Sequence, residues 1–296
     1  MNTKPHDIGF IGLGLMGTGF TQRLVEMGHS VIGYDLVDIK VKAASAWGVR
    51  AGESAADVAA NSDIVMVCVT STAAVEDVVF GPEGVANAAR PGSLLIDFST
   101  TVVGNTKDMA ARLKKQAGMG WIDAPVSGGP DAARDGTLAI MAGGSDDDVA
   151  TARPVMEQVS AAFTVFGDVG AGQVAKMVNQ VLVLNNYVVL AEALALAEAG
   201  GIDASKIPDA LAAGHAGSNM LRNVYPRMLA RDFAPKGYAR QILKDLDMVH
   251  DLAKDLRTPT PMSAQAASLF RIFNAKGHDE LDGIAILKLF DQQDSV

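Results

Sequence analysis

The sequence has few cysteines and few basic residues for its length. One cysteine, Cys68, stands among 296 residues, which excludes an internal disulfide and fits a reducing compartment. Lys and Arg number 25 against 34 Asp and Glu, and the formal net charge is −9. Because no excess of basic residues is available to neutralise phosphates, a nucleic-acid partner is disfavoured. A small anionic substrate would need a local positive site.

Patterns typical of secretion and membrane insertion are weak. The sequence starts MNTKPHDIGF, with one lysine and without the apolar run of a secretory signal, so we expect a cytoplasmic protein. The most apolar long stretch, residues 181–200, has the length of a membrane span. Asn185, Asn186, Glu192 and Glu198 within it would be costly in lipid. We therefore predict a buried core helix there and no membrane partner.

The first half of the chain has the alternation of an α/β protein. With 49% hydrophobic and 20% charged residues, the chain is long enough for two domains. Strands are predicted at Ile8–Gly12, Ser30–Tyr34, Ile64–Val69, Leu94–Phe98, Gly120–Asp123, Thr137–Ala142 and Ala162–Phe166. Helices between them include Met16–Met27, Val37–Ala46, Ser54–Ala60, Val75–Phe80 and Asn105–Lys115. This alternation predicts parallel strands with crossover helices in a doubly wound Rossmann-type sheet, which binds ligands beyond the carboxyl ends of its strands.

The second half is predicted to be all helical. Residues 173–199 contain neither Gly nor Pro, and as one helix these 27 residues would span roughly 40 Å. Further helices are predicted at Lys206–Ala213, Leu221–Ala230, Tyr238–Leu256, Ala264–Lys276 and Gly283–Phe290. We predict a nucleotide-binding domain over residues 1–168. We predict an all-α domain over residues 169–296 that begins with a long interdomain helix, and we expect it to contribute to substrate binding and oligomer formation.

The segment IGFIGLGLMGTGF, residues 8–20, has the glycine spacing of a dinucleotide-binding turn. Gly12 suits the tight turn, Gly14 lets the backbone approach a pyrophosphate, and Gly17 allows close packing of the next helix. Leu13, Leu15 and Met16 complete the turn, with Leu13 and Met16 more typical of packing than of chemistry. Asp35 follows Gly12 by 23 residues, at the end of the second predicted strand. A carboxylate there accepts hydrogen bonds from the ribose hydroxyls and repels a 2′-phosphate. The cofactor predicted is NAD rather than NADP.

Other catalytic patterns are absent from the sequence. The five histidines are scattered without ligand spacing, and neither HExxH nor CxxC occurs, so no metal site is predicted. The segment PVSGG, residues 125–129, contains a serine but no GxSxG elbow, which disfavours a hydrolase. Hydride transfer without a metal still needs an acid/base for the hydroxyl proton, which His, Lys, Tyr or a carboxylate can supply.

Four motifs in order carry a family resemblance. GFIGLGLMG, DAPVSGG (Asp123 to Gly129), GTLAIMAGG (Gly136 to Gly144) and GAGQVAKMVNQ (Gly170 to Gln180) resemble the β-hydroxyacid dehydrogenases. This family includes 3-hydroxyisobutyrate dehydrogenase and tartronate semialdehyde reductase. A later ILKDLDMV resembles its KDL segment. The resemblance implies a Rossmann-type domain, a long interdomain helix, an all-α domain and assembly as a homodimer or homotetramer.

The resemblance also implies roles for individual residues. Lys176 resembles the catalytic lysine, Asn179 a residue that helps to hold the substrate, and Ser127, Gly128 and Gly129 the loop that binds its carboxylate. Thr100 and Lys244 resemble residues beside the nicotinamide end of the cofactor. Lys176 and Asn179 are three apart on one helix face. A partly desolvated lysine has a lowered pKa, so its neutral form can accept the alcohol proton.

Each of these residues also has a purely structural interpretation. A lysine in a helix is commonly solvated, although VAKMVNQVLVL surrounds Lys176 with apolar residues. The structural alternative for Asn179 is a hydrogen bond in helix packing, and for Lys244 it is a place on a charged face that includes Asp245 and Asp247. For Thr100 the alternative is a helix cap. For the SGG segment it is a simple turn.

The substrate stays open among short hydroxy acids. The family often has two asparagines where this chain has Asn179 and Gln180, which changes pocket size rather than catalysis. The function predicted is NAD-dependent interconversion of a short hydroxy acid, such as 3-hydroxyisobutyrate or glycerate, and its semialdehyde or keto acid. The alternatives are a threonate-type 2-hydroxy acid dehydrogenase, an imine reductase-like enzyme and a non-catalytic nucleotide-binding reader protein. Lys176 speaks against the imine reductases, which usually lack the catalytic lysine.

Overall fold

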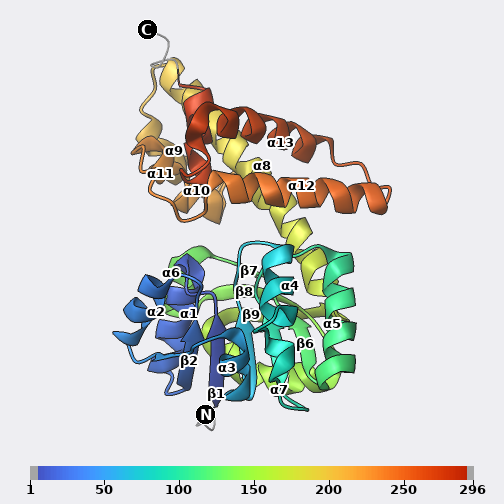
Figure 1. Cartoon of the computed structure of the whole chain (residues 1–296). Coiled ribbons are helices and arrows are strands. Elements are labelled where there is room, and N and C mark those ends of the chain that lie inside the picture. Colours follow the sequence, from blue (N-terminus) through green and yellow to red (C-terminus); the bar gives the residue numbers. More distant parts are fainter. Residues whose placement is uncertain (1–5, 292–296) are drawn as a thin grey trace. The chain divides into compact units, whose positions relative to one another are not determined.

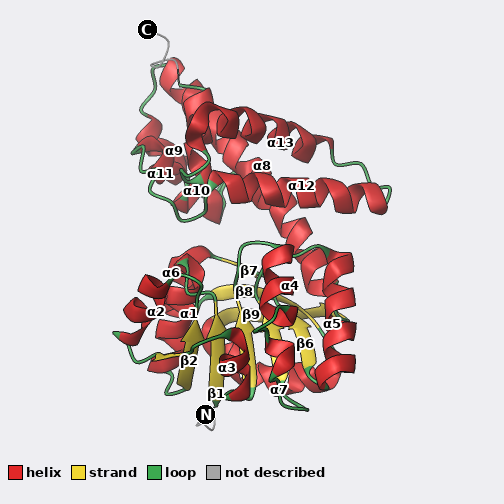
Figure 2. Cartoon of the chain, viewed as in Figure 1, coloured by secondary structure: helices red, strands yellow, loops and turns green. Residues whose placement is uncertain are grey.

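The computed structural model describes residues 6–291, which form two compact units. The border between them falls at Lys176 and Met177, inside a long helix, whereas the sequence analysis placed it at 168/169. Figure 1 shows the chain path, and Figure 2 shows that one unit contains helices and strands and the other only helices. The fold class predicted from the sequence is therefore confirmed.

The first unit contains one sheet. Its strands are β1 (Asp7–Ile11), β2 (Ser30–Tyr34), β3 (Arg50–Ala51), β4 (Ile64–Val67), β5 (Leu94–Asp97), β6 (Gly120–Asp123), β7 (Val126–Ser127), β8 (Leu138–Gly143) and β9 (Ser160–Gly167). The order is β3-β2-β1-β4-β5-β6-β8-β7, with β9 beside β8. The first six strands in this order are parallel and have the Rossmann order. The order in which the chain adds strands reverses between β1 and β4, and the glycine turn follows β1 at this point.

The expectation of an entirely parallel sheet was wrong at β8. This strand runs antiparallel to β6 and to β7. The only helix between β6 and β8 is α6 (Gly129–Asp135), which has seven residues. That is too short for the crossover that a parallel neighbour needs, so the chain returns in the opposite direction. The two-residue strands β3 and β7 were also not predicted, because such short pairs carry no period of their own.

Helices cover both faces of the sheet. They are α1 (Leu15–Glu26), α2 (Asp38–Ser45), α3 (Ala55–Ala60), α4 (Thr72–Phe80), α5 (Val103–Ala117), α6 and α7 (Asp146–Val159), with a short 3-10 turn η1 (Val85–Asn87). Ile8 and Phe10 of β1 pack in one core with α1, α6 and α7. Ile11 packs in the other core with α3, α4 and α5. Alternate side chains of the strands thus enter opposite cores, as the period of two requires.

The second unit is built around α8 (Ala171–Ala199). The other elements are η2 (Ala204–Lys206), α9 (Ile207–Leu211), α10 (Asn219–Asn223), α11 (Tyr225–Leu229), α12 (Ala239–Asp255), α13 (Pro261–Phe273), η3 (Asn274–His278) and η4 (Gly283–Leu289). The single helix expected at Leu221–Ala230 is two, because Pro226 lacks an N–H and lies in the first turn of α11. The one long helix expected after Gly172 is confirmed by α8.

One face of α8 lies in the core of the helical unit. Leu184, Ala191 and Leu194 are fully or almost fully buried there. By length and composition, α8 is the one helix among the described residues that could cross a membrane. The prediction of a core helix holds for this buried face, whereas Leu182, Val189 and Leu196 on another face are more than half exposed.

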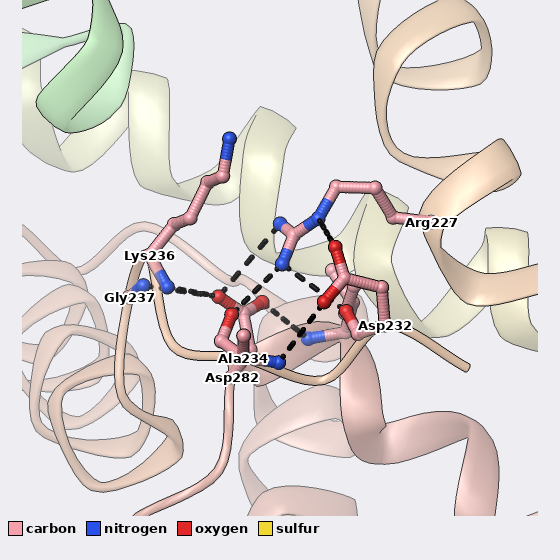
Figure 3. Close-up of polar contacts among 7 residues, drawn as sticks. Arg227, Asp232, Ala234, Lys236, Gly237 and Asp282 are labelled. Atoms are coloured by element: carbon pink, nitrogen blue, oxygen red, sulfur yellow. Dashed lines mark hydrogen bonds and ion pairs between the residues drawn. The ribbon is translucent and has the colours of Figure 1, made fainter. Parts of the chain in front are cut away.

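A buried carboxylate, that of Asp282, joins the loop before α12 to the start of η4. Figure 3 shows Asp282 with the loop that precedes α12. Its Oδ2 accepts the N–H groups of Lys236 at 2.6 Å and Gly237 at 3.1 Å, and its Oδ1 accepts that of Ile284 at 3.1 Å. Arg227 lies 3.9 Å from the same carboxylate and also binds Asp232. The loop is thereby held to the start of η4.

A second buried carboxylate holds the first turn of α8 on the sheet. Asp123 ends β6 and is fully buried. Its Oδ1 accepts the N–H of Gly170 at 2.7 Å, and its Oδ2 accepts the N–H of Gln173 at 2.9 Å. Burial raises the pKa of Asp123 to about 6, against the lowering effect of these N–H donors. The group is therefore mainly ionised at neutral pH, next to the positive end of a helix.

The raised pKa predicts how stability changes with pH. Because the folded pKa is about 6 and the ordinary value 3.8, the folded chain holds this proton more strongly than the unfolded chain. The contribution of Asp123 to the free energy of unfolding is thus present at low pH and lost as the pH rises through 6. In Asp123→Asn this loss is absent. The free energy of unfolding of the variant minus that of the wild type should rise by about 2 kcal/mol between pH 4 and pH 7. Urea unfolding at both pH values measures it, and a constant or falling difference would contradict the assignment.

Candidate active site

The turn after β1 has the geometry that its glycines predicted. Gly12 has φ +98°, and a Cβ there would lie 2.2 Å from the carbonyl oxygen of Cys68. A Cβ at Gly17 would lie 1.9 Å from the carbonyl oxygen of Gly12. At Gly14, by contrast, a Cβ would meet no atom within 4 Å. Gly12 and Gly17 are thus required by packing, whereas Gly14 leaves an open approach to the backbone at the start of α1.

The side chains between these glycines have different surroundings. Leu13 is almost fully buried in the core, and Met16 packs against that core. Leu15, the first residue of α1, is 44% exposed. A cofactor at this turn would therefore meet backbone N–H groups of the first helical turn, which have no partner within the helix.

Asp35 is bound directly to the glycine turn. Its Oδ2 accepts the N–H of Leu13 at 2.8 Å, and its Oδ1 accepts the N–H of Val37 at 2.9 Å. The ammonium of Lys40 lies 3.4 Å from Oδ1. The structure therefore places the carboxylate expected to bind ribose at the edge of the turn expected to bind pyrophosphate, with one cation beside it. These contacts fit a nicotinamide dinucleotide, whose diphosphate would lie over the turn and whose adenosine ribose would lie at Asp35.

Lys176 lies beside the loop expected to bind the substrate carboxylate. It is 8% exposed, and its Nζ donates to the carbonyl oxygen of Val126 at 2.8 Å. Val126 precedes Ser127, Gly128 and Gly129, whose two glycines have φ of +133° and +78°. Gly128 is exposed, and neither glycine carries a side chain over its backbone. Glycine-rich backbone of this kind is suited to binding an anion through its N–H groups. The structure thus places the lysine ammonium next to the residue that precedes the SGG segment.

Thr100 is joined to this group through Gln173. It follows β5 and is half-buried. The side-chain Nε2 of Gln173 donates to the carbonyl oxygen of Ser99 at 2.8 Å, and its Oε1 accepts the N–H of Thr101 at 3.0 Å. Both backbone neighbours of Thr100 are therefore fixed to the first turn of α8.

Asn179 and Lys244 belong to the helical unit. Asn179 Nδ2 donates to Gln180 Oε1 at 2.9 Å, and Gln180 Nε2 donates to Asp245 Oδ2 at 2.5 Å. The Nζ of Lys244 lies 3.1 Å from Asp245 Oδ1. A chain of polar contacts thus connects the two predicted residues through Gln180 and Asp245, both of which are buried.

The described residues do not support a thiolate nucleophile at Cys68 or a metal site. Burial of the thiol, together with the nearby charge of Asp97, raises the pKa of Cys68 to about 12, so the thiol stays protonated at neutral pH. Within residues 6–291, no group of three or more His, Cys, Asp or Glu side chains is placed to hold a metal ion.

The sequence analysis missed the residues that hold the others in place. Asp123 was visible as the carboxylate that ends a short apolar strand, and it lies inside the quoted DAPVSGG segment. Gln173 was visible as a polar residue one turn before Lys176 in an apolar helix. Neither signal says what the side chain binds, because the partners of Asp123 and Gln173 lie 47 to 74 residues away along the chain.

Comparison with known proteins covers both units. Residues 7–167 match the NAD binding domain of 6-phosphogluconate dehydrogenase. Residues 170–290 match the family described as NAD-binding of NADP-dependent 3-hydroxyisobutyrate dehydrogenase. The two descriptions name both cofactors.

Full-length relatives show the same relationship. The chain is 34% identical to the 2-hydroxy-3-oxopropionate reductase of Escherichia coli, over 96% of this chain and 97% of that protein. It is also 34% identical to the L-threonate dehydrogenase of Cupriavidus necator, over 96% of each chain. The crystal structure of 3-hydroxyisobutyrate dehydrogenase from Salmonella typhimurium superposes with a TM-score of 0.88 at 31% identity, over 96% of this chain and 99% of that chain. This protein therefore belongs to the 3-hydroxyisobutyrate dehydrogenase, or β-hydroxyacid dehydrogenase, family of NAD(P)-dependent oxidoreductases.

Proposed function

We propose that this oxidoreductase interconverts a short-chain hydroxy acid, such as 3-hydroxyisobutyrate or glycerate, and its semialdehyde or keto acid, with Lys176 as general acid/base. The contact between Lys176 and Val126 carries the proposal, because it holds a buried amine one residue away from the SGG loop. A substrate whose carboxylate is bound at Ser127, Gly128 and Gly129 would place its hydroxyl carbon within reach of that amine.

The division of roles follows from the chemistry of these groups. The nicotinamide, when bound, accepts or supplies the hydride. The neutral amine of Lys176 accepts the hydroxyl proton in oxidation, and its ammonium form returns the proton in reduction. Backbone N–H groups of the SGG loop hold the substrate carboxylate and supply the local positive site that a chain of net charge −9 needs. Thr100 and Lys244 are proposed to lie beside the nicotinamide, and Asn179 to help hold the substrate.

NAD is the proposed cofactor, with NADP used less well. The support is Asp35, whose carboxylate would accept the ribose hydroxyls and repel a 2′-phosphate. Lys40 partly offsets that repulsion because its ammonium lies 3.4 Å from the same carboxylate. A preference rather than strict exclusion is therefore expected.

The assembly and location are also proposals. We infer a homodimer or homotetramer, supported by the exposed apolar residues Leu182, Val189 and Leu196, which recur every seven positions along α8. A cytoplasmic location is supported by the single free cysteine. Threonate-type 2-hydroxy acids stay the second candidate substrate class, supported by the similarity to a threonate dehydrogenase.

Replacing the proposed acid/base tests the reaction. Lys176→Ala should lower turnover by about 10²- to 10⁴-fold because the hydroxyl proton then has no acceptor. Lys176→Arg should be equally inactive, since a guanidinium does not deprotonate. Absorbance of the reduced nicotinamide measures turnover with glycerate, 3-hydroxyisobutyrate and threonate, and fluorescence measures NADH binding, which should persist. Lys115→Ala, which changes an exposed lysine of α5, is the control. Near-normal turnover of Lys176→Ala would refute the proposed role.

Cofactor preference should depend on the charge of Asp35. Asp35→Asn keeps an oxygen for the N–H of Leu13 but removes the repulsion of a 2′-phosphate. The ratio of the NADPH to the NADH dissociation constant should fall by at least about tenfold, which corresponds to about 1.4 kcal/mol. Lys40→Ala should change the ratio in the opposite direction. Fluorescence titration of both nucleotides gives the ratios, and tighter binding of NADPH than NADH by the wild type would contradict the proposal.

A further inference from the structure

Gln173 makes more contacts across the sheet unit than any role in helix formation requires. The residue is fully buried. Its side-chain amide uses both its donor and its acceptor on the backbone around Thr100, with Ser99 O at 2.8 Å and Thr101 N at 3.0 Å. The backbone N–H of Gln173 donates to Asp123 Oδ2 at 2.9 Å. One residue therefore connects the loop after β5, the end of β6 and the first turn of α8.

The same turn of α8 also carries Lys176, three residues later on the same face. Lys176 in turn donates to Val126, directly before Ser127. The turn has little freedom to shift, because a Cβ at Gly172 would lie 2.5 Å from Met141 O and 2.6 Å from Asp123 O. The side-chain amide of Gln173 therefore links the backbone on both sides of Thr100 to the turn that carries Lys176.

We propose that Gln173 is a positioning residue, whose side-chain amide fixes Thr100, at the nicotinamide end of the cofactor site, relative to Lys176 at the substrate. This inference rests on the proposed function, which assigns the two sites. The amide suits the task because it is neutral and offers one donor and one acceptor group to a segment that presents one carbonyl and one N–H. Glutamate in its ionised form has no donor, and an apolar side chain has neither group.

A merely structural role makes a different prediction. If Gln173 only satisfied buried backbone groups, its loss would lower stability as any lost buried hydrogen bond does, and activity would follow stability. If it positions Thr100 and Lys176, the reaction should suffer more than stability and more than cofactor binding. Misplacement by about 1 Å can cost about 100-fold in rate. The adenosine half of the cofactor depends on the glycine turn and Asp35, which Gln173 does not contact.

The test compares Gln173→Met with Ser160→Ala. Methionine has a similar length without the amide. Ser160 is also buried in the sheet unit and donates to Met156 O at 2.7 Å, so its loss removes a buried hydrogen bond outside the Gln173 contacts. For both variants and the wild type, kcat and KM for the hydroxy acid, the dissociation constant of NADH, the melting temperature and amide hydrogen exchange are measured.

For Gln173→Met, kcat should fall about 10- to 100-fold with less than about a threefold change in the NADH dissociation constant. Exchange should rise in segments 99–101 and 170–176 together. Ser160→Ala, which loses one buried hydrogen bond where Gln173→Met loses two, should have a lowered melting temperature but a kcat within about twofold of the wild type. The inference is overturned if exchange at 99–101 is unchanged in Gln173→Met, or if its kcat equals that of Ser160→Ala. A wild type inactive with every hydroxy acid would instead overturn the proposed function, while the exchange measurement would still decide whether Gln173 couples the two segments.

Discussion

The geometry of the site depends on how the first turn of α8 meets the sheet. The carboxylate of Asp123 at the end of β6 accepts two N–H groups of that turn, and Gly172 permits backbone contact without a side chain between. A helix that began one residue later would present a different face at position 176. Because α8 is continuous, this one contact fixes where Lys176 emerges relative to the loop at Val126 and Ser127. A buried charge is costly alone, and the N–H donors and the helix dipole offset only part of that cost here, because the pKa of Asp123 is still raised to about 6.

The predictable part of the molecule is the part specified by local pattern. The glycines at 12, 14 and 17 each had a separate steric reason, and the structure gives each of them a different environment. The long helix after Gly172 followed from the absence of Gly and Pro and was found at Ala171–Ala199. The antiparallel return of β8 was not predictable in this way, because it depends on how short the intervening helix is. Pro226 was visible in the sequence as a residue that interrupts helices, but one helix was predicted across it. The structure has two helices there.

The candidate site divides along the same line. Lys176 and the SGG segment were named from the family resemblance, and in the structure Lys176 donates a hydrogen bond to Val126, the residue before that segment. Asp123 and Gln173 were not named, because their role is a relation between segments distant in the sequence. A polar side chain in an apolar segment can be recognised in the sequence, but its hydrogen-bond partners are set only when strands and helices have packed. Sequence reasoning therefore finds the groups that carry chemistry more readily than the groups that hold them.

The departure from the family at Gln180 has a physical explanation within the helical unit. Gln180 reaches Asp245 on α12 and receives a hydrogen bond from Asn179. Asparagine at this position would be shorter by one methylene, about 1.5 Å, and would lose Asp245 unless α12 moved. Asp245 lies 3.1 Å from the ammonium of Lys244, so the length of residue 180 also affects where that ammonium lies. The longer amide therefore sets the reach to Asp245 and, through it, the place of Lys244, whereas Lys176, the proposed acid/base, donates to Val126 in the sheet unit. Differences in substrate between members of this family are expected to arise at such amides, which change reach without changing charge.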